Sequence, residues 1–489
     1  MGQSGFVIGG NDGVGISQLG SMSNRHGLIA GATGTGKTVT LQILAEGFSR
    51  MGVPVFAADI KGDLSGLATA NSGKDFSSRL DAIGISDYSP APCPTLFWDL
   101  LGDKGHPVRT TISEMGPLLL GALFELNETQ EGILYAAFRI ADEQGMLMLD
   151  LKDLKAMLNW MSDNAKELRS DYGNISSQSV GAIQRRLLVL EEQGGDNFFG
   201  EPALQLHDLM QIDFSGNGVI SLLDSSRLIA QSPRLYTAFL LWILSELFEQ
   251  LPEQGDQEKP KMVFFFDEAH LLFEQASKPL LEKIEQVVRL IRSKGVGIYF
   301  ITQNPSDIPD DVLGQLGLKV QHALRAFTPK DRKAIKAVAE NFRASPGLDI
   351  ESTLTELGIG EALVSVLDAK GTPTRVARTL IRPPQSHIGP LEASERQQRI
   401  DRSPIGARYQ EMMDRQSAYE ILKQRAEQQA VTEVAAAERA AEEKAEKKGS
   451  GSRRQSVGEA MMKSVARTIG SQIARRIVRG VLGSIFGGK

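Results

Sequence analysis

Residues 28–38 read Leu-Ile-Ala-Gly-Ala-Thr-Gly-Thr-Gly-Lys-Thr, an apolar run that leads into the pattern Gly-x-x-x-x-Gly-Lys-Thr. Glycines allow backbone N–H groups to approach a row of phosphates closely, and the positive end of a following helix adds to that attraction. The phosphate-binding residues that this pattern predicts are Gly31, Ala32, Thr33, Gly34, Thr35, Gly36, Lys37 and Thr38. The stretch therefore predicts a nucleoside-triphosphate site.

The flanking residues favour this interpretation over an ordinary glycine-rich turn. Residues 38–49 carry apolar side chains at helical spacing, and residues 53–58 form a second apolar run that ends at Asp59. This order of strand, loop, helix and strand is typical of the start of a P-loop fold. In such a loop Lys37 would reach the β- and γ-phosphate oxygens, and the hydroxyl of Thr38 would bind Mg²⁺.

A second candidate element lies far along the chain. Residues 262–266, Met-Val-Phe-Phe-Phe, form a continuous apolar run that ends in Asp267 and Glu268. A strand buried on both faces has this pattern, and ligands bind at the carboxyl ends of such strands. We expect Asp267 to lie at the Mg²⁺ and Glu268 to act as the base that polarises the attacking water.

A third apolar run, residues 296–302, is followed by Gln303. In RecA-like ATPases the strand after the acidic one lies beside the P-loop strand and supplies a polar sensor of the γ-phosphate, and Gln303 fits that role. Residues 59–63, Asp-Ile-Lys-Gly-Asp, also follow a strand. They are compatible either with contact to a Mg²⁺-bound water or substrate, or with a turn built on Gly62 and capped by Asp63.

Together these segments resemble the HerA-like branch of the FtsK/HerA ATPases over residues 20–385. The resemblance is strongest to the bacterial YjgR-type group, in the phrases Asn24-Arg-His-Gly-Leu-Ile, Phe264-Phe-Phe-Asp-Glu-Ala-His-Leu-Leu, Asn304-Pro-Ser-Asp-Ile-Pro and His322-Ala-Leu-Arg-Ala-Phe-Thr-Pro-Lys330. It implies a RecA-type motor domain, ATP as the nucleotide, a homo-oligomeric ring that is usually hexameric, and ATP-driven movement of DNA. No residue by itself excludes GTP.

A nucleotide site between the subunits of a ring needs an arginine from the neighbouring subunit. Arg292 is the first candidate, at the end of a helix predicted over residues 279–293, and Arg325 is the second, within a strand predicted over residues 320–327. Each is equally compatible with a helix-end cation or an internal ion pair.

The resemblance also has gaps. Only about twenty residues precede the phosphate-loop strand, so we expect no N-terminal β-barrel of the kind that archaeal HerA proteins use to dock a nuclease, and no dedicated partner nuclease is inferred.

The predicted fold class is α/β, a RecA-like P-loop domain with a mainly parallel central sheet, a helical insertion and a helical or disordered C-terminal tail. The predicted divisions are residues 1–100 and 216–385 for the two parts of the core, 101–215 for the insertion, 386–456 for a charged linker and 457–489 for a basic amphipathic helix. That last helix would lie on an anionic membrane, bind DNA phosphates or pack in an oligomer.

Bulk composition adds a few limits. A single cysteine among 489 residues excludes a disulfide framework within the chain and fits a reducing cytoplasm. The net charge of −6 argues against a surface that is basic everywhere. Three functions stay open: a DNA translocase or helicase, an ATPase at the inner face of the membrane that powers protein transfer, and a scaffold assembled by nucleotide.

Overall fold

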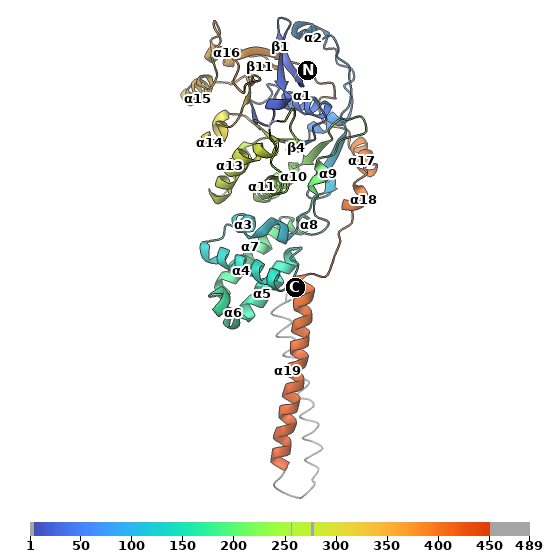
Figure 1. Cartoon of the computed structure of the whole chain (residues 1–489), viewed down its shortest axis with the longest axis vertical. Coiled ribbons are helices and arrows are strands. Elements are labelled where there is room, and N and C mark those ends of the chain that lie inside the picture. The colour runs from blue at the N-terminus through green and yellow to red at the C-terminus, as the bar shows by residue number, and fades with distance from the viewer. Residues whose placement is uncertain (1–3, 256, 275–277, 450–489) are drawn as a thin grey trace. The chain divides into compact units, whose positions relative to one another are not determined.

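The computed structural model describes residues 4–255, 257–274 and 278–449. Its core is a 12-stranded sheet with the order β2-β1-β12-β11-β10-β3-β9-β8-β4-β7-β5-β6. Figure 1 shows the whole chain with β1, β4 and β11 of this sheet labelled. The strands are β1 Gly5–Asn11, β2 Val14–Leu19, β3 Gly27–Ala30, β4 Val55–Asp59, β5 Thr95–Asp99, β6 His106–Pro107, β7 Ile220–Asp224, β8 Met262–Phe266, β9 Val296–Thr302, β10 Leu318–His322, β11 Glu361–Ser365 and β12 Ala377–Ile381.

The middle of the sheet is parallel, as expected. The phosphate-loop strand β3 pairs with β9 on one side and with β10 on the other, and β9 also pairs with β8. The strand that ends before Gln303 therefore lies between the phosphate-loop strand and the acidic strand. Because parallel strands share a direction, the loops that follow β3, β4, β8 and β9 emerge at one edge of the sheet.

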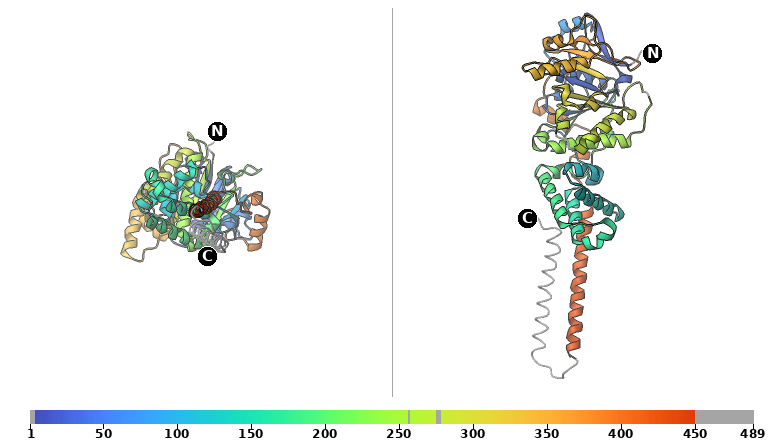
Figure 2. Two further views of the ribbon diagram at one scale, coloured as in Figure 1. Left: turned by 90° about the horizontal axis from the view of Figure 1, so that it is seen from below. Right: turned by 90° about the vertical axis from the view of Figure 1, so that its left-hand side faces the viewer.

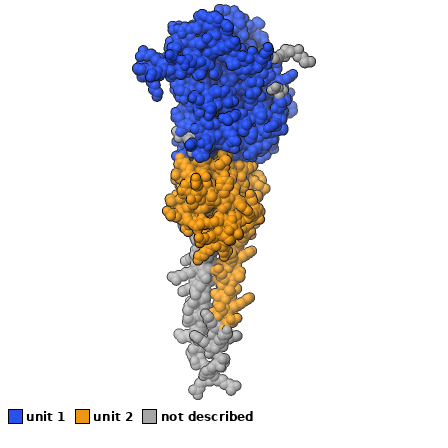
Figure 3. Space-filling view, turned by 60° about the vertical axis from the view of Figure 1, so that its left-hand side comes forward, with its two compact units in different colours: residues 1–109, 202–412 blue, residues 110–201, 413–489 orange. Residues whose placement is uncertain are grey.

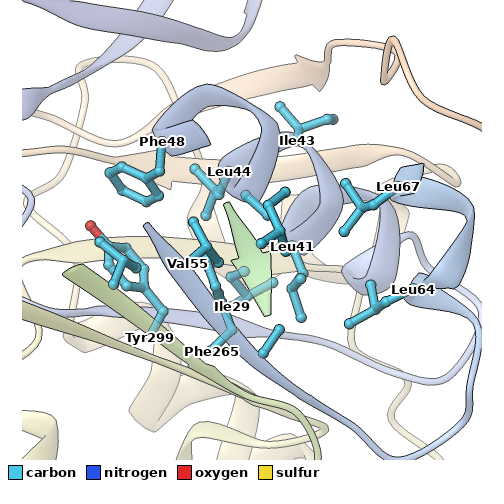
Figure 4. Close-up of a cluster of buried hydrophobic side chains, with 14 of the residues drawn as sticks. Ile29, Leu41, Ile43, Leu44, Phe48, Val55, Leu64, Leu67, Phe265 and Tyr299 are labelled. Carbon is cyan, nitrogen blue, oxygen red and sulfur yellow. The ribbon is translucent and has the colours of Figure 1, made fainter. Parts of the chain in front are cut away.

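One face of the sheet is covered by α1, Lys37–Arg50. Figure 4 shows Leu41, Leu44 and Phe48 of this helix packed against Ile29, Val55, Phe265 and Tyr299 of the sheet. All seven side chains are at most 1% exposed. The apolar positions at helical spacing in residues 38–49 therefore became the packing face that fixes α1, and with it the phosphate loop, to the sheet.

The opposite face is covered by α11, Pro233–Gln250, and α13, Lys278–Ile291, which contact each other. Alternate strand residues point to this side, including Phe264, Phe266 and Phe300, and the ring of Phe273 packs on Phe300 with centroids 5.5 Å apart. Burial on both faces explains why β8 and β9 read as unbroken apolar runs.

Four strands extend the sheet in antiparallel fashion. The β1–β2 hairpin pairs with β12, and β11 lies between β12 and β10. The sequence did not predict this extension. Three of the seven residues of β1 are glycine, which weakens the pattern expected of a strand.

The predicted strand over residues 320–327 was wrong beyond His322, where β10 ends. His322 pairs with Ala362 of the antiparallel strand β11, which begins at Glu361. The partner strand therefore offers only one more residue beyond that pair. The backbone after His322 changes partners: Ala323 O accepts from Ala32 N, and Leu324 N donates to Leu354 O. Arg325 therefore lies on an exposed segment after the strand rather than within it.

Contacts divide the chain into two units (Figure 3). Unit 1 holds residues 4–109 and 202–412 of the described chain, and unit 2 holds residues 110–201 and 413–449. Unit 2 is helical, and its α19, Ala418–Gly449, is one long helix (Figure 2) whose N-terminal part packs on α5, Leu151–Asp163. Residues 450–456 and the basic helix predicted over residues 457–489 lie outside the described residues.

The remaining helices of unit 1 are α2 Ser77–Ile83, α9 Leu206–Leu209, α10 Ser226–Gln231, α12 His270–Glu274, α14 Asp310–Leu313, α15 Pro329–Glu340, α16 Ile350–Glu356, α17 Ala393–Asp401, α18 Gly406–Tyr409 and the 3-10 turns Gly20–Met22, Leu64–Ala68, Arg292–Lys294 and Pro305–Asp307. Those of unit 2 are α3 Ile112–Leu123, α4 Glu128–Glu143, α5 Leu151–Asp163, α6 Ala165–Tyr172, α7 Ser177–Glu192 and α8 Gly195–Phe198. Residues 101–215 thus hold helices and only one short strand, β6.

Candidate nucleotide-binding site

The phosphate loop joins β3 to α1. Gly34 and Gly36 have φ values of +77° and +114°, which side chains rarely adopt. Gly31 has φ +152°, and a Cβ on it would lie 2.5 Å from the Cβ of His322. The loop is tied to both neighbouring strands, since Gly31 N donates to Thr302 O and Ala32 N to Ala323 O. Backbone conformation therefore favours glycine at all three positions, and lack of space also requires it at Gly31.

Lys37, the first residue of α1, lies back across this loop. Its Nζ donates to the carbonyl oxygens of Gly31 at 2.6 Å and Ala32 at 3.1 Å. Burial lowers the pKa of the ammonium, and the nearby carboxylate of Glu268 raises it. The predicted phosphate-binding lysine is therefore buried, held over the loop and close to the acidic pair.

The acidic pair follows β8 directly. Burial raises the pKa of Asp267 to about 6, with Lys61 acting against this and Glu268 adding to it. One carboxylate oxygen, Oδ1, accepts from the backbone N of Glu268 at 2.9 Å. Glu268 itself has a φ of +45°, unusual for a residue with a side chain. Such backbone strain is common where a side chain must be held in a functional position.

Glu268 is contacted by a side chain to which the sequence pattern gave no definite role. Nζ of Lys61 lies 2.6 Å from Oε1 of Glu268, and Nδ1 of His270 lies 3.4 Å from Oε2. Burial opposes ionisation of Glu268, but Lys61 and a hydrogen bond with Gln303 outweigh it and hold the pKa of Glu268 below its ordinary value. The predicted base, its predicted neighbour Gln303 and Lys61 thus form one cluster.

The loop after β4 reaches both halves of the site. Asp59 closes the turn at its base, accepting from the backbone N of Gly62 at 2.7 Å and of Leu64 at 3.0 Å. Burial raises the pKa of Asp63, and a hydrogen bond from the hydroxyl of Thr38 acts in the opposite direction. The sequence left this segment open between a turn and a contact with the site. The structure shows the turn, which Asp59 rather than Asp63 closes. Contact of this segment with a Mg²⁺-bound water or substrate stays a prediction.

Two buried histidines connect helices of unit 1 to the strands beside the phosphate loop. His322 Nε2 lies 2.8 Å from Oγ1 of Thr40 in α1, and its Nδ1 lies 2.9 Å from the carbonyl of Glu361. His26 Nε2 lies 2.9 Å from the carbonyl of Val288, and its Nδ1 accepts from the backbone N of Ile298. Burial lowers the pKa of each imidazole to about 4. Neutral rings thus tie α1 and α13 to the sheet, a role that needs distant partners and has no local sequence signal.

The two candidate arginines lie apart in the chain's own fold. Arg292 is exposed in the 3-10 turn before β9, at the amino end of that strand and hence at the edge opposite the phosphate loop. Arg325 follows the carboxyl end of β10, is exposed, and donates to the carbonyl of Thr355 at 3.1 Å. The action of either arginine in a neighbouring subunit stays a prediction.

The residues present fit a nucleoside triphosphate with Mg²⁺. Glycines at 31, 34 and 36 leave three positions of the loop without a side chain, and α1 begins at the loop's end. The donor set combines an ammonium on Lys37 with the hydroxyl of Thr38 and the carboxylate of Asp267, the oxygen ligands that Mg²⁺ prefers. Fold and site together define a RecA-like P-loop nucleotide-binding protein.

The comparisons place the chain more closely. The sequence profile of the helicase HerA-like C-terminal family matches residues 7–489, and the chain belongs to that family. The narrower resemblance to YjgR-type proteins stays a prediction.

Two curated relatives agree with this assignment. The DNA double-strand break repair helicase HerA of Sulfolobus acidocaldarius is 23% identical over 379 residues, which cover 74% of this chain and 66% of the relative. A probable helicase of Methanocaldococcus jannaschii, MJECL08, is 32% identical over 134 residues, which cover 26% of this chain and 24% of the relative. The chain thus spans no more than about two thirds of the length of these relatives.

Solved structures confirm the fold. The plasmid coupling protein TrwB in complex with the GTP analogue GDPNP has a TM-score of 0.53 at 14% identity, covering 80% of this chain and 92% of that one. TrwB in complex with ADP and Mg²⁺ has a TM-score of 0.51 at 13% identity, covering 79% and 90%. The RecA-like core is therefore shared with proteins whose sequences are far removed.

Proposed function

We propose that this chain is an ATP-hydrolysing motor that acts on DNA as a homo-oligomeric ring. The observation that carries the proposal is the cluster at the carboxyl edge of the sheet, where Lys37, Asp267, Glu268 and Gln303 converge from three different loops. A protein that only bound phosphate would need the loop and its lysine, whereas a buried base beside a polar side chain serves hydrolysis.

Each side chain has a definite task in this proposal. Backbone N–H groups of residues 31–38 bind the phosphates, and Lys37 contacts the β- and γ-phosphate oxygens. Thr38 and Asp267 hold Mg²⁺, which neutralises charge on the phosphates when it is bound. Glu268 accepts the proton of the attacking water, and Gln303 orients that water or the γ-phosphate. ATP is favoured over GTP by the family alone.

A DNA substrate is supported by family membership and by the name of the Sulfolobus acidocaldarius relative, a DNA double-strand break repair helicase. The ring and its hexameric stoichiometry rest on the resemblance to the HerA-like ATPases alone. Arg292 or Arg325 would complete the site of a neighbouring subunit, and the exposure of both side chains makes them accessible to it. We place the protein in the cytoplasm. Among the helices of residues 4–255, 257–274 and 278–449, none is long and apolar enough to cross a membrane.

The test is steady-state ATP hydrolysis by the purified chain with double-stranded DNA, single-stranded DNA or anionic liposomes, and with Glu268→Gln as the blank. We expect hydrolysis that DNA stimulates and that Glu268→Gln reduces by about a hundredfold or more, with ATP binding retained. Stimulation by liposomes alone would favour an ATPase at the membrane. Hydrolysis in Glu268→Gln equal to that of the wild type would contradict the assigned base.

A further inference from the structure

Lys61 stands out because it is an exposed lysine whose ammonium contacts a buried carboxylate. Its side chain is 43% exposed, whereas that of its partner Glu268 is 9% exposed. The backbone on either side is fixed, because Asp59 accepts from the N–H groups of Gly62 and Leu64. The side chain above this fixed turn is a flexible four-carbon stem with a compact charge.

The ammonium of Lys61 lies in the same group of charges as the ammonium of Lys37. The charge of Lys61 lowers the pKa of Lys37, so the two cations lie close enough to repel each other. Burial lowers the pKa of Lys61, but the carboxylates of Glu268, Asp267 and Asp63 raise it above its ordinary value. Lys61 and Lys37 thus approach the same acidic cluster from two loops, although they are far from each other in sequence.

The contact between Lys61 and Glu268 is at odds with the role proposed for Glu268. An ammonium 2.6 Å from a carboxylate oxygen stabilises the ionised carboxylate and makes it a poorer acceptor for a proton. A terminal phosphate carries more negative charge than a carboxylate and so competes for the same ammonium. Occupation of Lys61 by phosphate would leave Glu268 available to the attacking water.

We infer that Lys61 binds the terminal phosphate of the nucleotide, and that its transfer from Glu268 to this phosphate releases Glu268 for hydrolysis. The inference rests on the proposed function, and it adds a phosphate ligand that the sequence pattern did not assign. It also gives the site a way to distinguish a triphosphate from a diphosphate, since only the triphosphate offers the competing anion.

The experiment measures equilibrium binding of fluorescent ATP and fluorescent ADP to the full chain with Mg²⁺. It is done in the Glu268→Gln background, which prevents turnover and removes the carboxylate through which Lys61 would otherwise act. In this background we expect Lys61→Met to weaken ATP binding about tenfold and to change ADP binding less than about twofold. Lys61→Arg keeps the charge and should retain most of the ATP affinity.

Lys336→Met, at an exposed position on α15, serves as the matched loss of one lysine and should change neither affinity. Lys61→Gln repeats the test with a polar side chain in case the methionine disturbs the loop, and ADP binding reports in each variant whether the site has formed. Unchanged ATP binding in Lys61→Met or Lys61→Gln would overturn the inference, because Lys61 would then act only through Glu268. Failure of Glu268→Gln with native Lys61 to bind either nucleotide would instead contradict the proposed function.

Discussion

The loops after β4 and β8 each start with a buried aspartate, but the two aspartates form different hydrogen bonds. Both strands are parallel neighbours, and both are followed at the carboxyl edge of the sheet by a buried aspartate whose pKa is raised by burial, to about 7 for Asp59 and about 6 for Asp267. Asp59 spends both carboxylate oxygens on backbone N–H groups and so closes a turn. Asp267 accepts one short-range bond from Glu268 N.

This difference teaches that an acid at the end of a strand is not by itself a metal ligand. The backbone conformation of the next residues decides whether their N–H groups form hydrogen bonds with both oxygens of the carboxylate. After β4, Gly62 takes a φ of +76° and turns the chain back toward Asp59. After β8, Glu268 takes a φ of +45° and the chain enters α12.

The largest expected effect comes from neutralising each aspartate in turn. Asp267→Asn should lower the rate of ATP hydrolysis by about a thousandfold, because the proposed Mg²⁺ ligand loses its charge. Asp59→Asn keeps one of the two oxygen acceptors of the turn, so it should weaken the turn but lower the rate by less than about fivefold. Steady-state hydrolysis at saturating Mg²⁺ measures both, and equal losses in the two variants would contradict the comparison.

Glycine substitutions compare the phosphate loop with the loop after β4. Gly31→Ala places a Cβ 2.5 Å from that of His322 and should cost about 3 kcal/mol of stability together with nucleotide binding. Gly62→Ala has open space around it and a φ of +76°, so only backbone strain of about 1 kcal/mol is expected. Thermal denaturation of the two variants gives the order, and a greater loss in Gly62→Ala would show that crowding at His322 is relieved.

A smaller effect tests the neighbour of Glu268. Gln303→Ala removes a hydrogen bond that helps to hold the Glu268 carboxylate. We expect turnover to fall about tenfold while the affinity for ADP stays near that of the wild type. Separate measurement of kcat and of ADP binding distinguishes this from collapse of the site, and an unchanged kcat would remove Gln303 from the mechanism.

The smallest expected effect is a pH dependence of stability that comes from His26, a buried residue outside both loops. Its folded-state pKa is about 4 against an ordinary value of 6.5. The unfolded chain therefore takes up a proton before the folded one, so the stability contributed by neutral His26 is complete above pH 6.5 and is lost as the pH falls toward 4. Between pH 8 and pH 5.5 this amounts to about 1 kcal/mol.

Thermal midpoints at the two pH values provide the measurement. His26→Gln should be less stable than the wild type at pH 8 and should lack this part of the decline toward pH 5.5. An equal loss of thermal stability in both proteins would show that the pKa of His26 is not lowered by burial as expected. It would also weaken the argument that burial raises the pKa of Asp59 and Asp267.

The sequence pattern predicted those parts of the site in which the chemistry restricts residue types within a few consecutive positions. The phosphate loop and strands β8 and β9 lie where the apolar runs and the polar residues after them indicated. The antiparallel extension was missed, and at β1 the three glycines among its seven residues weaken the pattern expected of a strand. The end of β10 was misplaced, because the apolar run continues past His322 while the pairing partner does not.

The sequence by itself determined that the chain has a phosphate loop, that an acidic pair follows a buried strand, and that helix α1 has one apolar face. These features are set by neighbours within a few residues. Only the tertiary structure decided that Lys61 contacts Glu268, that Asp59 closes a turn while Asp267 does not, and that neutral histidines anchor α1 and α13. Those contacts join residues as much as 282 positions apart, and their energies depend on burial and distance, which exist only after the sheet has brought its strands together.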